Sequence, residues 1–328
     1  MKRKALALFS GGLDSILACK LVEQQGVEVE ALHFITPFFG CSEPSSYVST
    51  ARDKYGIELS VIDAADDFLK TLAKPSYGYG SGFNPCIDCK ILLLDLAKRE
   101  LVARKASFLI SGEVLGQRPM SQNRSALDLI GRKSSAGDLL VRPLSALCLP
   151  PTEPEREGWV DRSKLAGIQG RSRKHQMNLA ATLGITEYPA PAGGCVLTDP
   201  VLSKRIRKLF GLVEIDGNAC RLMQVGRHFF LPNNNWLILG RNEAENNRIE
   251  ELSRNGDLVI SAYGVPGPTG LLRGKNNYSD RVLAGSILGM YTKLRNTPEV
   301  DVRLTGYGVS EKMIIPPSGQ EAVDACRA

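Results

Sequence analysis

The stretch LALFSGGLDSILACKL, residues 6–21, joins a short apolar run to a helical pattern through two consecutive glycines. Leu6 to Phe9 predicts a buried strand, and Leu13 to Leu21 predicts a helix that starts directly after Gly12. A strand, a tight glycine turn and a helix N-terminus in this order form a natural anion site. The stretch therefore predicts one βα unit whose turn binds a negatively charged ligand.

Strands alternate with helices in the residues that follow. The pattern predicts strands at 27–34, 58–62 and 108–110, and a helix at 85–103. This alternation favours an α/β fold, a doubly wound parallel sheet with helices on both faces. Ligands of such sheets gather at the carboxyl ends of the strands. We therefore expect the glycine turn after Phe9, the loop after Phe34 and the SGE segment after Ile110 to meet at one edge.

A domain boundary is expected near residue 200. The Pro/Glu-rich stretch LPPTEPEREGW (149–159) predicts a loop, and a helix is expected around 172–183. Asp199 is a helix cap, Pro200 fits the first turn, and Gly211 ends that helix. We assign residues 1–199 to the first domain and 200–328 to a smaller α+β domain. Its expected strands are 236–239 and 258–261, and its expected helices are 243–253 and 280–293.

Composition narrows the class of protein. A chain of 328 residues is long enough for two domains of about 150 residues each. No apolar run approaches the roughly 20 residues of a membrane span, and the five apolar residues before Ser10 are fewer than the roughly 7–15 of a secretory core. A cytoplasmic protein without a membrane partner is therefore expected, and its eight cysteines are expected to serve metal, cluster or redox chemistry rather than disulfides. The net charge of +6 permits an RNA partner.

The turn SGGLDS, residues 10–15, lacks the lysine of a Walker A loop, so it does not predict a kinase. Gly11 and Gly12 let the backbone approach a phosphate, and Ser10 and Ser15 offer hydroxyls. Asp14 suits this place if a divalent cation bridges it to the phosphates or if it positions another group. The turn resembles the PP-loop of the ATP pyrophosphatase superfamily, whose members cleave ATP between the α- and β-phosphates and adenylate an oxygen. The resemblance implies ATP and magnesium at Ser10–Ser15.

Two further segments extend the resemblance. It places adenosine against the end of the second strand, at His33 and Phe34. SGEVLGQRPMSQ (111–122) resembles the T-G-E-x-L-G-Q-x-x-S-Q segment of the ThiI 4-thiouridine synthases, with Ser111 in place of threonine, and it adds Ser111 and Gly112 to the expected ATP site. RPLSAL (142–147) resembles the R-P-L segment of ThiI and of the MnmA 2-thiouridylases.

Three cysteines are candidates for sulfur chemistry. NPCIDC (84–89) is similar to the N-P-C-x-x-C segment of some MnmA-type enzymes, and Cys195 lies in the Gly-rich GGCVLTDP. Some members of the superfamily hold a 4Fe-4S cluster with three such cysteines, here Cys86, Cys89 and Cys195, so that the fourth iron can bind hydrosulfide. Two alternatives stay open. A persulfide mechanism needs only two thiols, and a structural zinc would need a fourth ligand such as Cys148, His175 or His228.

The carboxyl-terminal part supplies a candidate RNA-binding region. Residues 236–274 resemble the NFACT-R domain through G-R-N-x-x-E-N and a later V-P-G, although an Asn242–Glu245 capping box would also explain part of this pattern. The candidate phosphate contacts there are Lys204, Arg205, Arg207, Lys208, Arg241 and Arg273. Arg171, Arg173 and Lys174 form a second basic cluster shortly before Cys195.

Together the resemblances imply an enzyme, an ATP-dependent tRNA sulfurtransferase that adenylates a uridine and replaces its oxygen with sulfur. The expected product is 4-thiouridine at tRNA position 8, and the alternative is 2-thiouridine at the wobble position. Cys86, Cys89, Cys195 and Asp14 are the expected catalytic residues. Its expected partners are tRNA and a sulfur donor, either free sulfide or a persulfide derived from a cysteine desulfurase, and it can assemble as a homodimer. A ligase that adenylates a small molecule and an RNA-binding module without activity are the other hypotheses.

Overall fold

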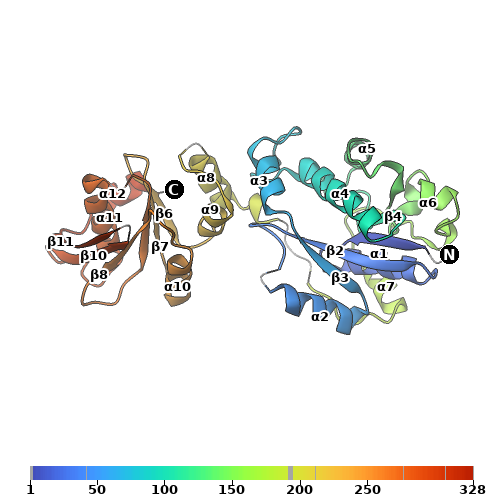
Figure 1. The fold of residues 1–328 in the computed structure, drawn as a ribbon, viewed down its shortest axis with the longest axis horizontal. Helices are drawn as coiled ribbons and strands as arrows, with labels where there is room; N and C mark the ends of the chain where they lie inside the picture. Colours follow the sequence, from blue (N-terminus) through green and yellow to red (C-terminus); the bar gives the residue numbers. More distant parts are fainter. Residues whose placement is uncertain are drawn as a thin grey trace. The chain divides into compact units, whose positions relative to one another are not determined.

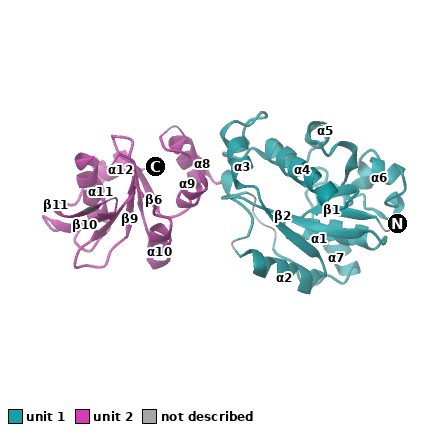
Figure 2. Cartoon of the chain, viewed as in Figure 1, with its two compact units in different colours: residues 1–198 teal, residues 199–328 magenta. Residues whose placement is uncertain are grey.

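The chain forms two compact units, Met1–Thr198 and Asp199–Ala328 (Figure 2). The computed structural model describes residues 3–41, 43–190, 195–210, 212–275, 277–306 and 308–327. Within these ranges, no helix combines the length and the apolar composition needed to cross a bilayer. Each unit has its own sheet and its own hydrophobic core, so each is described separately.

The first unit is built on a five-stranded sheet with the strand order β3-β2-β1-β4-β5 (Figure 1). The strands are β1 (Lys4–Leu8), β2 (Glu28–Ile35), β3 (Glu58–Asp63), β4 (Phe108–Ser111) and β5 (Leu140–Val141). All of the neighbouring strands are parallel, with Leu8 of β1 in register with Leu32 of β2 and with Ser111 of β4. The predicted parallel sheet is confirmed.

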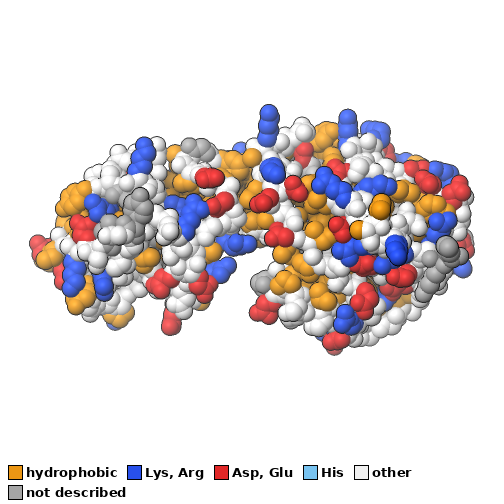
Figure 3. Space-filling model, viewed as in Figure 1, with side chains coloured by type: hydrophobic (Ala, Val, Ile, Leu, Met, Phe, Trp, Pro, Cys, Tyr) orange, Lys and Arg blue, Asp and Glu red, His pale blue; other side chains and the backbone are white. Residues whose placement is uncertain are grey.

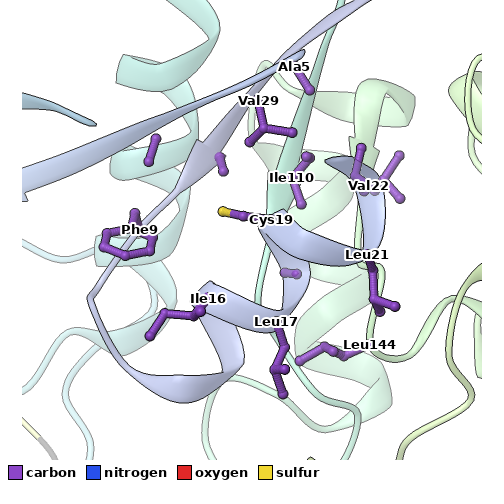
Figure 4. Packing of buried hydrophobic residues seen from close by; sticks show 14 of the residues in the cluster. Ala5, Phe9, Ile16, Leu17, Cys19, Leu21, Val22, Val29, Ile110 and Leu144 are labelled. Carbon is purple, nitrogen blue, oxygen red and sulfur yellow. The ribbon is translucent and has the colours of Figure 1, made fainter. Parts of the chain in front are cut away.

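Helices cover both faces of this sheet because successive strand residues point to opposite sides. Ala5 and Ala7 pack in a cluster with α1 (Leu13–Glu23), α2 (Pro44–Tyr55) and α7 (Lys174–Thr182). Leu6 packs on the other side with α4 (Cys86–Ala103) and α5 (Arg124–Lys133), and α3 (Ala65–Ala73) packs against α4. Figure 4 shows the first of these clusters, with Ile16, Leu17 and Cys19 of α1 among its members.

The strand order fixes where a ligand can bind. The chain runs outward from β1 to β2 and β3, then returns to add β4 on the other side of β1. The loops that follow β1 and β4 therefore leave the sheet in opposite directions, and ligands of open α/β sheets bind in the crevice between such loops. The turn at 10–12 and the segment at 111–113 flank this crevice.

The predicted loop at 149–159 is wrong in part, whereas the predicted start of a helix at Asp199 is confirmed. The stretch 149–159 is not entirely loop, because α6 (Glu153–Arg156) forms a single helical turn there. Thr152 and Glu155 make a reciprocal capping box, with the Glu155 carboxylate accepting from the Thr152 amide at 2.8 Å, and this stabilises the short turn. The helix α8 (Pro200–Leu209) begins as predicted, with the Asp199 carboxylate accepting from the amide of Leu202 at 2.7 Å. Its expected stop at Gly211 lies outside the described residues.

The second unit contains a six-stranded antiparallel sheet with the order β11-β10-β8-β9-β7-β6. The strands are β6 (Arg227–Phe230), β7 (Trp236–Leu239), β8 (Leu258–Ala262), β9 (Gly270–Arg273), β10 (Val300–Gly306) and β11 (Val309–Ile315). The helices α11 (Tyr278–Met290) and α12 (Gln320–Cys326) pack on one face, while α10 (Glu243–Glu251) packs against β9; α9 (Gly217–Leu222) precedes the sheet. The predicted α+β class is confirmed.

Candidate active site

The turn after β1 leaves the N-terminus of α1 open to an anion. Gly12 occupies the cap position, so no side chain covers the first amides of the helix. The Ser15 hydroxyl donates to the Gly12 carbonyl at 2.7 Å, and the Gly12 amide lies 3.5 Å from the Ser10 hydroxyl oxygen. These contacts hold the turn in the shape that a phosphate-binding loop needs, with helix dipole and amides directed at the same place.

Tyr47 of α2 lies directly over this turn. Gly11 has a φ of +75°, and a Cβ built on it would lie 2.0 Å from the Tyr47 hydroxyl oxygen. Burial raises the pKa of Tyr47 to about 12, so the phenol is a neutral hydrogen-bond donor at physiological pH. The sequence prediction did not include Tyr47, because one tyrosine in a mostly polar helix carries no signal that it reaches a loop 36 positions earlier.

His33 and Phe34 lie at the end of β2, as the resemblance implied, but both side chains are occupied. The His33 Nδ1 lies 2.9 Å from the Phe9 carbonyl oxygen, so it carries the proton and donates, and burial lowers the pKa of the ring. The ring packs on that of Tyr47 with centroids 4.2 Å apart. The side chain of Phe34 is buried in the cluster that contains Leu6. A nucleotide at this strand end would therefore meet mainly the backbone of Phe34.

Asp14 is held by two segments distant in the sequence. Its Oδ2 accepts from the Gln117 side-chain amide at 2.7 Å, and Gln117 in turn accepts from Gln176 of α7 at 2.9 Å. An Arg173 guanidinium nitrogen lies 3.9 Å from the Asp14 Oδ1, which is buried and accepts no hydrogen bond from any described residue. Asp14 thus has one oxygen fixed by an amide and one oxygen left for a further ligand.

The end of β4 touches the first turn of α1. A Cβ on Gly112 would lie 2.6 Å from the backbone carbonyl of Asp14 and 2.7 Å from the amide nitrogen of Ser15. Only glycine fits this contact, because those atoms belong to the backbone and cannot rotate away. Ser111 and Gly112 therefore stand against the Ser10–Ser15 turn, and the structure brings together the predicted ATP-site residues of these two loops.

Glu113 connects the SGE segment to the RPL segment. Its side chain is 2% exposed and accepts from the Ser111 hydroxyl at 3.0 Å and from the Arg142 Nε at 2.9 Å, with the Lys90 ammonium 3.9 Å away. Burial acts to raise the pKa of Glu113, but the Arg142 and Lys90 charges outweigh it and hold the pKa below its ordinary value. The carboxylate is therefore ionised and fixes both loops.

Replacing Arg142 by glutamine should destabilise the first unit by about 3–5 kcal/mol at pH 7, because it leaves a buried carboxylate without its main partner. In the wild type the lowered pKa of Glu113 contributes stability that is complete above its ordinary value and is lost as the pH falls through the folded pKa. In the variant the folded pKa rises, so the deficit should shrink as the pH falls. Urea unfolding at several pH values measures this.

Arg124→Gln is the matched control, because Arg124 forms a half-exposed pair with Asp128 on α5. Its loss should be below about 1 kcal/mol. Equal losses in the two variants, or a deficit for Arg142→Gln that does not depend on pH, would contradict the role given to Glu113.

The three candidate cysteines are neighbours in space. Cys86 and Cys89 lie in the first turn of α4, and Cys195 precedes a short 3-10 helix at Val196–Thr198. A hydrogen bond of 2.8 Å from the Phe83 amide to the Leu197 carbonyl joins the two segments. Burial raises the pKa of Cys89, and the neighbouring Cys86 and Cys195 act in the same direction.

The Cys89 and Cys195 thiols are protonated as the structure presents them. Burial raises the pKa of Cys89 to about 12 and also raises that of Cys195. Cys86 accepts a hydrogen bond from the Asn84 side-chain amide at 3.0 Å, and Asn84 also lies 3.6 Å from the Met120 sulfur. Among the residues that the structure describes, no three His, Cys, Asp or Glu side chains are spaced as ligands of one metal ion. The donor set suits thiolate chemistry of iron or sulfur, and the sulfurs are gathered without being closed into a ligand shell.

Contacts that start from α4 connect the cysteine segment to the end of β4, which packs against the Ser10–Ser15 turn. Lys90 follows Cys89 in the sequence and reaches Glu113, which is bonded to Ser111 at the end of β4. Asn84, Glu113, Gln117 and Gln176 complete the connection, and none of them was assigned a role from the sequence. Asn84, Glu113 and Gln117 lie in recognised motifs, whereas Gln176 does not.

The candidate phosphate contacts of the second unit differ in burial and in the partners that their side chains already have. Arg273 is wrong as a phosphate contact, because it is buried and paired with Asp257 at 2.6 Å. Arg205 donates to the backbone carbonyls of Met223 and Gly226, and Arg241 pairs with Glu245. Asn242 caps α10 as predicted, but the Glu245 carboxylate accepts from the Arg241 amide, so the capping box is incomplete. Lys204 is exposed.

Comparison with known proteins divides the chain in the same way. Residues 1–147 match the family model described as thiamine biosynthesis protein (ThiI), and residues 226–325 match that of the NFACT protein RNA binding domain. The chain is 31% identical over 118 residues to the tRNA-specific 2-thiouridylase MnmA of Nitratidesulfovibrio vulgaris, covering 32% of this chain and 34% of the relative. It is 29% identical over 154 residues to a probable tRNA sulfurtransferase of Ureaplasma parvum, covering 44% and 37%.

The chain thus spans about a third of the length of the curated relatives it matches. Among solved structures, a 4-thiouridine synthetase–RNA complex with bound ATP aligns over 56% of this chain and 52% of its own, at 19% identity and a TM-score of 0.35. The carboxyl-terminal part of a fibronectin/fibrinogen-binding protein from Streptococcus suis aligns over 47% and 73%, at 13% identity and a TM-score of 0.29.

Proposed function

We propose that this chain, in which a ThiI-type domain precedes an NFACT-type RNA-binding domain, is an ATP-dependent tRNA sulfurtransferase. Residues 1–199 would activate and thiolate a uridine, and residues 200–328 would hold the RNA. One observation carries the proposal. Cysteines from segments more than 100 positions apart lie on neighbouring backbone, joined by the hydrogen bond from Phe83 to Leu197, and Lys90 of the helix that bears two of them lies 3.9 Å from Glu113.

The first step is adenylation. The Ser10–Ser15 turn binds the pyrophosphate part of ATP through its amides and the N-terminus of α1. An oxygen of the uridine attacks the α-phosphorus, the bond between that phosphorus and the oxygen bridging to the β-phosphate breaks, and pyrophosphate leaves. The Asp14 Oδ1, which accepts no hydrogen bond from a described residue, is where a magnesium ion would be held once the Arg173 side chain turns to the phosphates, and the ion would offset the phosphate charge. The product is a base whose oxygen has become part of a good leaving group.

The second step replaces that oxygen. A sulfur nucleophile attacks the activated carbon, AMP departs with the former uridine oxygen, and loss of a proton leaves a thiocarbonyl. If the nucleophile is a cysteine persulfide, a second thiol must release the product, and a disulfide forms that an external reductant reopens. If Cys86, Cys89 and Cys195 hold a 4Fe-4S cluster, it supplies an iron without a protein ligand, where hydrosulfide can bind. The sulfur comes from free sulfide or from the persulfide of a desulfurase.

The choice of product rests on the segment at 111–122. Its G-E-V-L-G-Q run favours 4-thiouridine at tRNA position 8, because ThiI carries this run, whereas the R-P-L segment is common to ThiI and MnmA. The relative with 31% identity is a 2-thiouridylase, so 2-thiouridine at the wobble position is the second candidate. Digesting the product tRNA and separating its nucleosides by mass and retention distinguishes the two.

Purification without oxygen, followed by iron and sulfide analysis and a thiolation assay on unmodified tRNA, tests the proposal. We expect a brown protein with about four irons per chain and incorporation of sulfur that needs ATP, tRNA and sulfide together. A colourless, iron-free protein that thiolates fully, with a disulfide formed in each turnover, would replace the cluster by persulfide chemistry. ATP–pyrophosphate exchange that needs a small metabolite and ignores tRNA would contradict the proposed function.

A further inference from the structure

The sheet of the second unit is covered unevenly. Val300, Val302 and Leu304 of β10 point into the core beneath α11 and α12. On the opposite side of the sheet, Trp236 of β7 and Leu271 of β9 are also buried. The opposite side of β8, β10 and β11 is different, because its side chains are exposed or half-buried. We call this surface the open face; its members are Val259, Ser261, Tyr263, Asp301, Arg303, Thr305, Ser310, Lys312 and Ile314.

Two cations lie opposite each other on the open face. Arg303 of β10 is in register with Lys312 of β11, and both side chains point away from the core. Like charges directly opposite across two strands destabilise a sheet. No described carboxylate lies within ion-pair distance of either side chain, although Asp301 is on the same face. A bound anion would relieve this repulsion.

Apolar and aromatic groups stand beside these cations. Tyr263 is 50% exposed, and the Lys312 ammonium lies 4.1 Å from the centroid of its ring. Ile314, in register with Asp301, is 66% exposed. Each exposed side chain alone is ordinary, but a flat ring next to unpaired cations on a sheet is the surface that unpaired nucleotides use, with bases on rings and phosphates on cations.

On the face of each unit that Figure 3 presents, charge does not form one large basic surface. Figure 3 shows Lys and Arg side chains interspersed with Asp and Glu over the face of each unit that is in view. The nearest rival for RNA is the exposed side of α8, with Lys204 and Lys208, but the Lys208 ammonium already donates to the Arg327 carbonyl at 3.2 Å. The open face offers two cations that have no carboxylate partner among the described residues, and an aromatic ring beside them.

We propose that the open face binds an unpaired segment of the RNA substrate, with a base stacked on Tyr263 and phosphates held by Arg303 and Lys312. The inference rests on the proposed function in taking tRNA as the substrate. It adds the surface, the residues and the single-stranded character of what is bound there. A base that stacks on Tyr263 displaces the Lys312 ammonium from the ring toward the adjacent phosphate.

Fluorescence anisotropy of labelled, unmodified tRNA with the full chain tests this. The double variant Arg303→Gln with Lys312→Gln should weaken binding about tenfold or more at 0.1 M salt and should lower the slope of log affinity against log salt by about 1.4, for two lost contacts to single-stranded RNA. Tyr263→Ala should weaken binding about fivefold or more, while Tyr263→Phe keeps the ring and should bind like the wild type. Arg248→Gln, whose guanidinium pairs with Glu251 on α10, is the matched charge control.

The outcomes separate this inference from the proposed function. A wild-type chain that does not bind tRNA would contradict the proposed function itself. Wild-type binding that survives the double variant, or that falls instead with Lys204→Gln and Lys208→Gln, would overturn the open face as the RNA site. Competition by polyglutamate as strong as competition by oligouridine of equal charge would also overturn it, because it would mark a site for acidic peptides.

Discussion

Alanine in place of Cys86, Cys89 or Cys195 should each abolish thiolation, with a loss of about 10³-fold or more, because the proposed cluster takes one thiolate from each of the three cysteines. ATP binding by the Ser10–Ser15 turn should be unchanged, since that turn packs against Gly112 rather than against the sulfurs. The measurement is sulfur incorporation into unmodified tRNA, alongside ATP affinity by calorimetry.

Cys148→Ala is the matched control, because Cys148 is another half-buried free thiol of the first unit. It should thiolate at the wild-type rate. The pattern among the three single variants also identifies the chemistry. Loss in all three supports the cluster, whereas a persulfide pair predicts that one of the three is dispensable. Full activity in all three variants would show that the site assignment is wrong.

Gly112→Ala should reduce ATP-dependent adenylation about 10²-fold or more, because a displacement of about 1 Å at a reacting group costs this much. The new methyl group would meet the Asp14 carbonyl at 2.6 Å and the Ser15 amide at 2.7 Å, so the end of β4 and the start of α1 must separate. AMP formation in the presence of tRNA measures the effect, and thermal unfolding shows whether the fold survives.

The control for this substitution is Gly131→Ala on α5, where a Cβ meets nothing within 4 Å. Alanine there should leave activity unchanged and should stabilise the protein by up to about 1 kcal/mol, the helix propensity difference. A Gly112→Ala enzyme with normal turnover and normal ATP affinity would contradict the tight contact between the two loops.

The sequence predicts β1 to β4 because they are apolar runs bounded by turns, but it does not predict β5, which has only two residues. It does not predict α2, whose sequence PSSYVSTARDKY buries only Ala51 fully, so no apolar stripe marks it. It also omits β10 and β11, although Val300, Val302 and Leu304 alternate with polar residues. Five alternating residues bounded by weak turns are a short signal, and the strands are stable only because they pair with β8 and with each other.

The candidate site, like the fold, is predicted only in the parts that form consecutive motifs in the sequence. The motifs predict Ser10–Ser15, Ser111 and Gly112 as site residues because the glycines and hydroxyl side chains that such a loop needs are consecutive in the sequence. The contacts that support these residues cannot be recognised in the sequence, because they join distant positions. The Gln117 amide that donates to Asp14 lies 103 positions away from it. Arg273 shows the converse error, because a basic residue in a recognised segment is the buried partner of Asp257. Charge type can be read from sequence, but its exposure depends on the packing around it.

The start of α4 holds several candidate site residues at fixed separations from one another. Cys86 and Cys89 stand within its first turn, and Lys90, which directly follows that turn, approaches the carboxylate that orders the end of β4. Groups mounted on one helix keep their separation far better than groups on loops. In the proposed reaction, helical geometry would thereby set the spacing between Cys86 and Cys89 and the side chain that approaches Glu113. Cys195 comes from a separate segment, so the geometry of α4 does not fix its distance from Cys86 and Cys89.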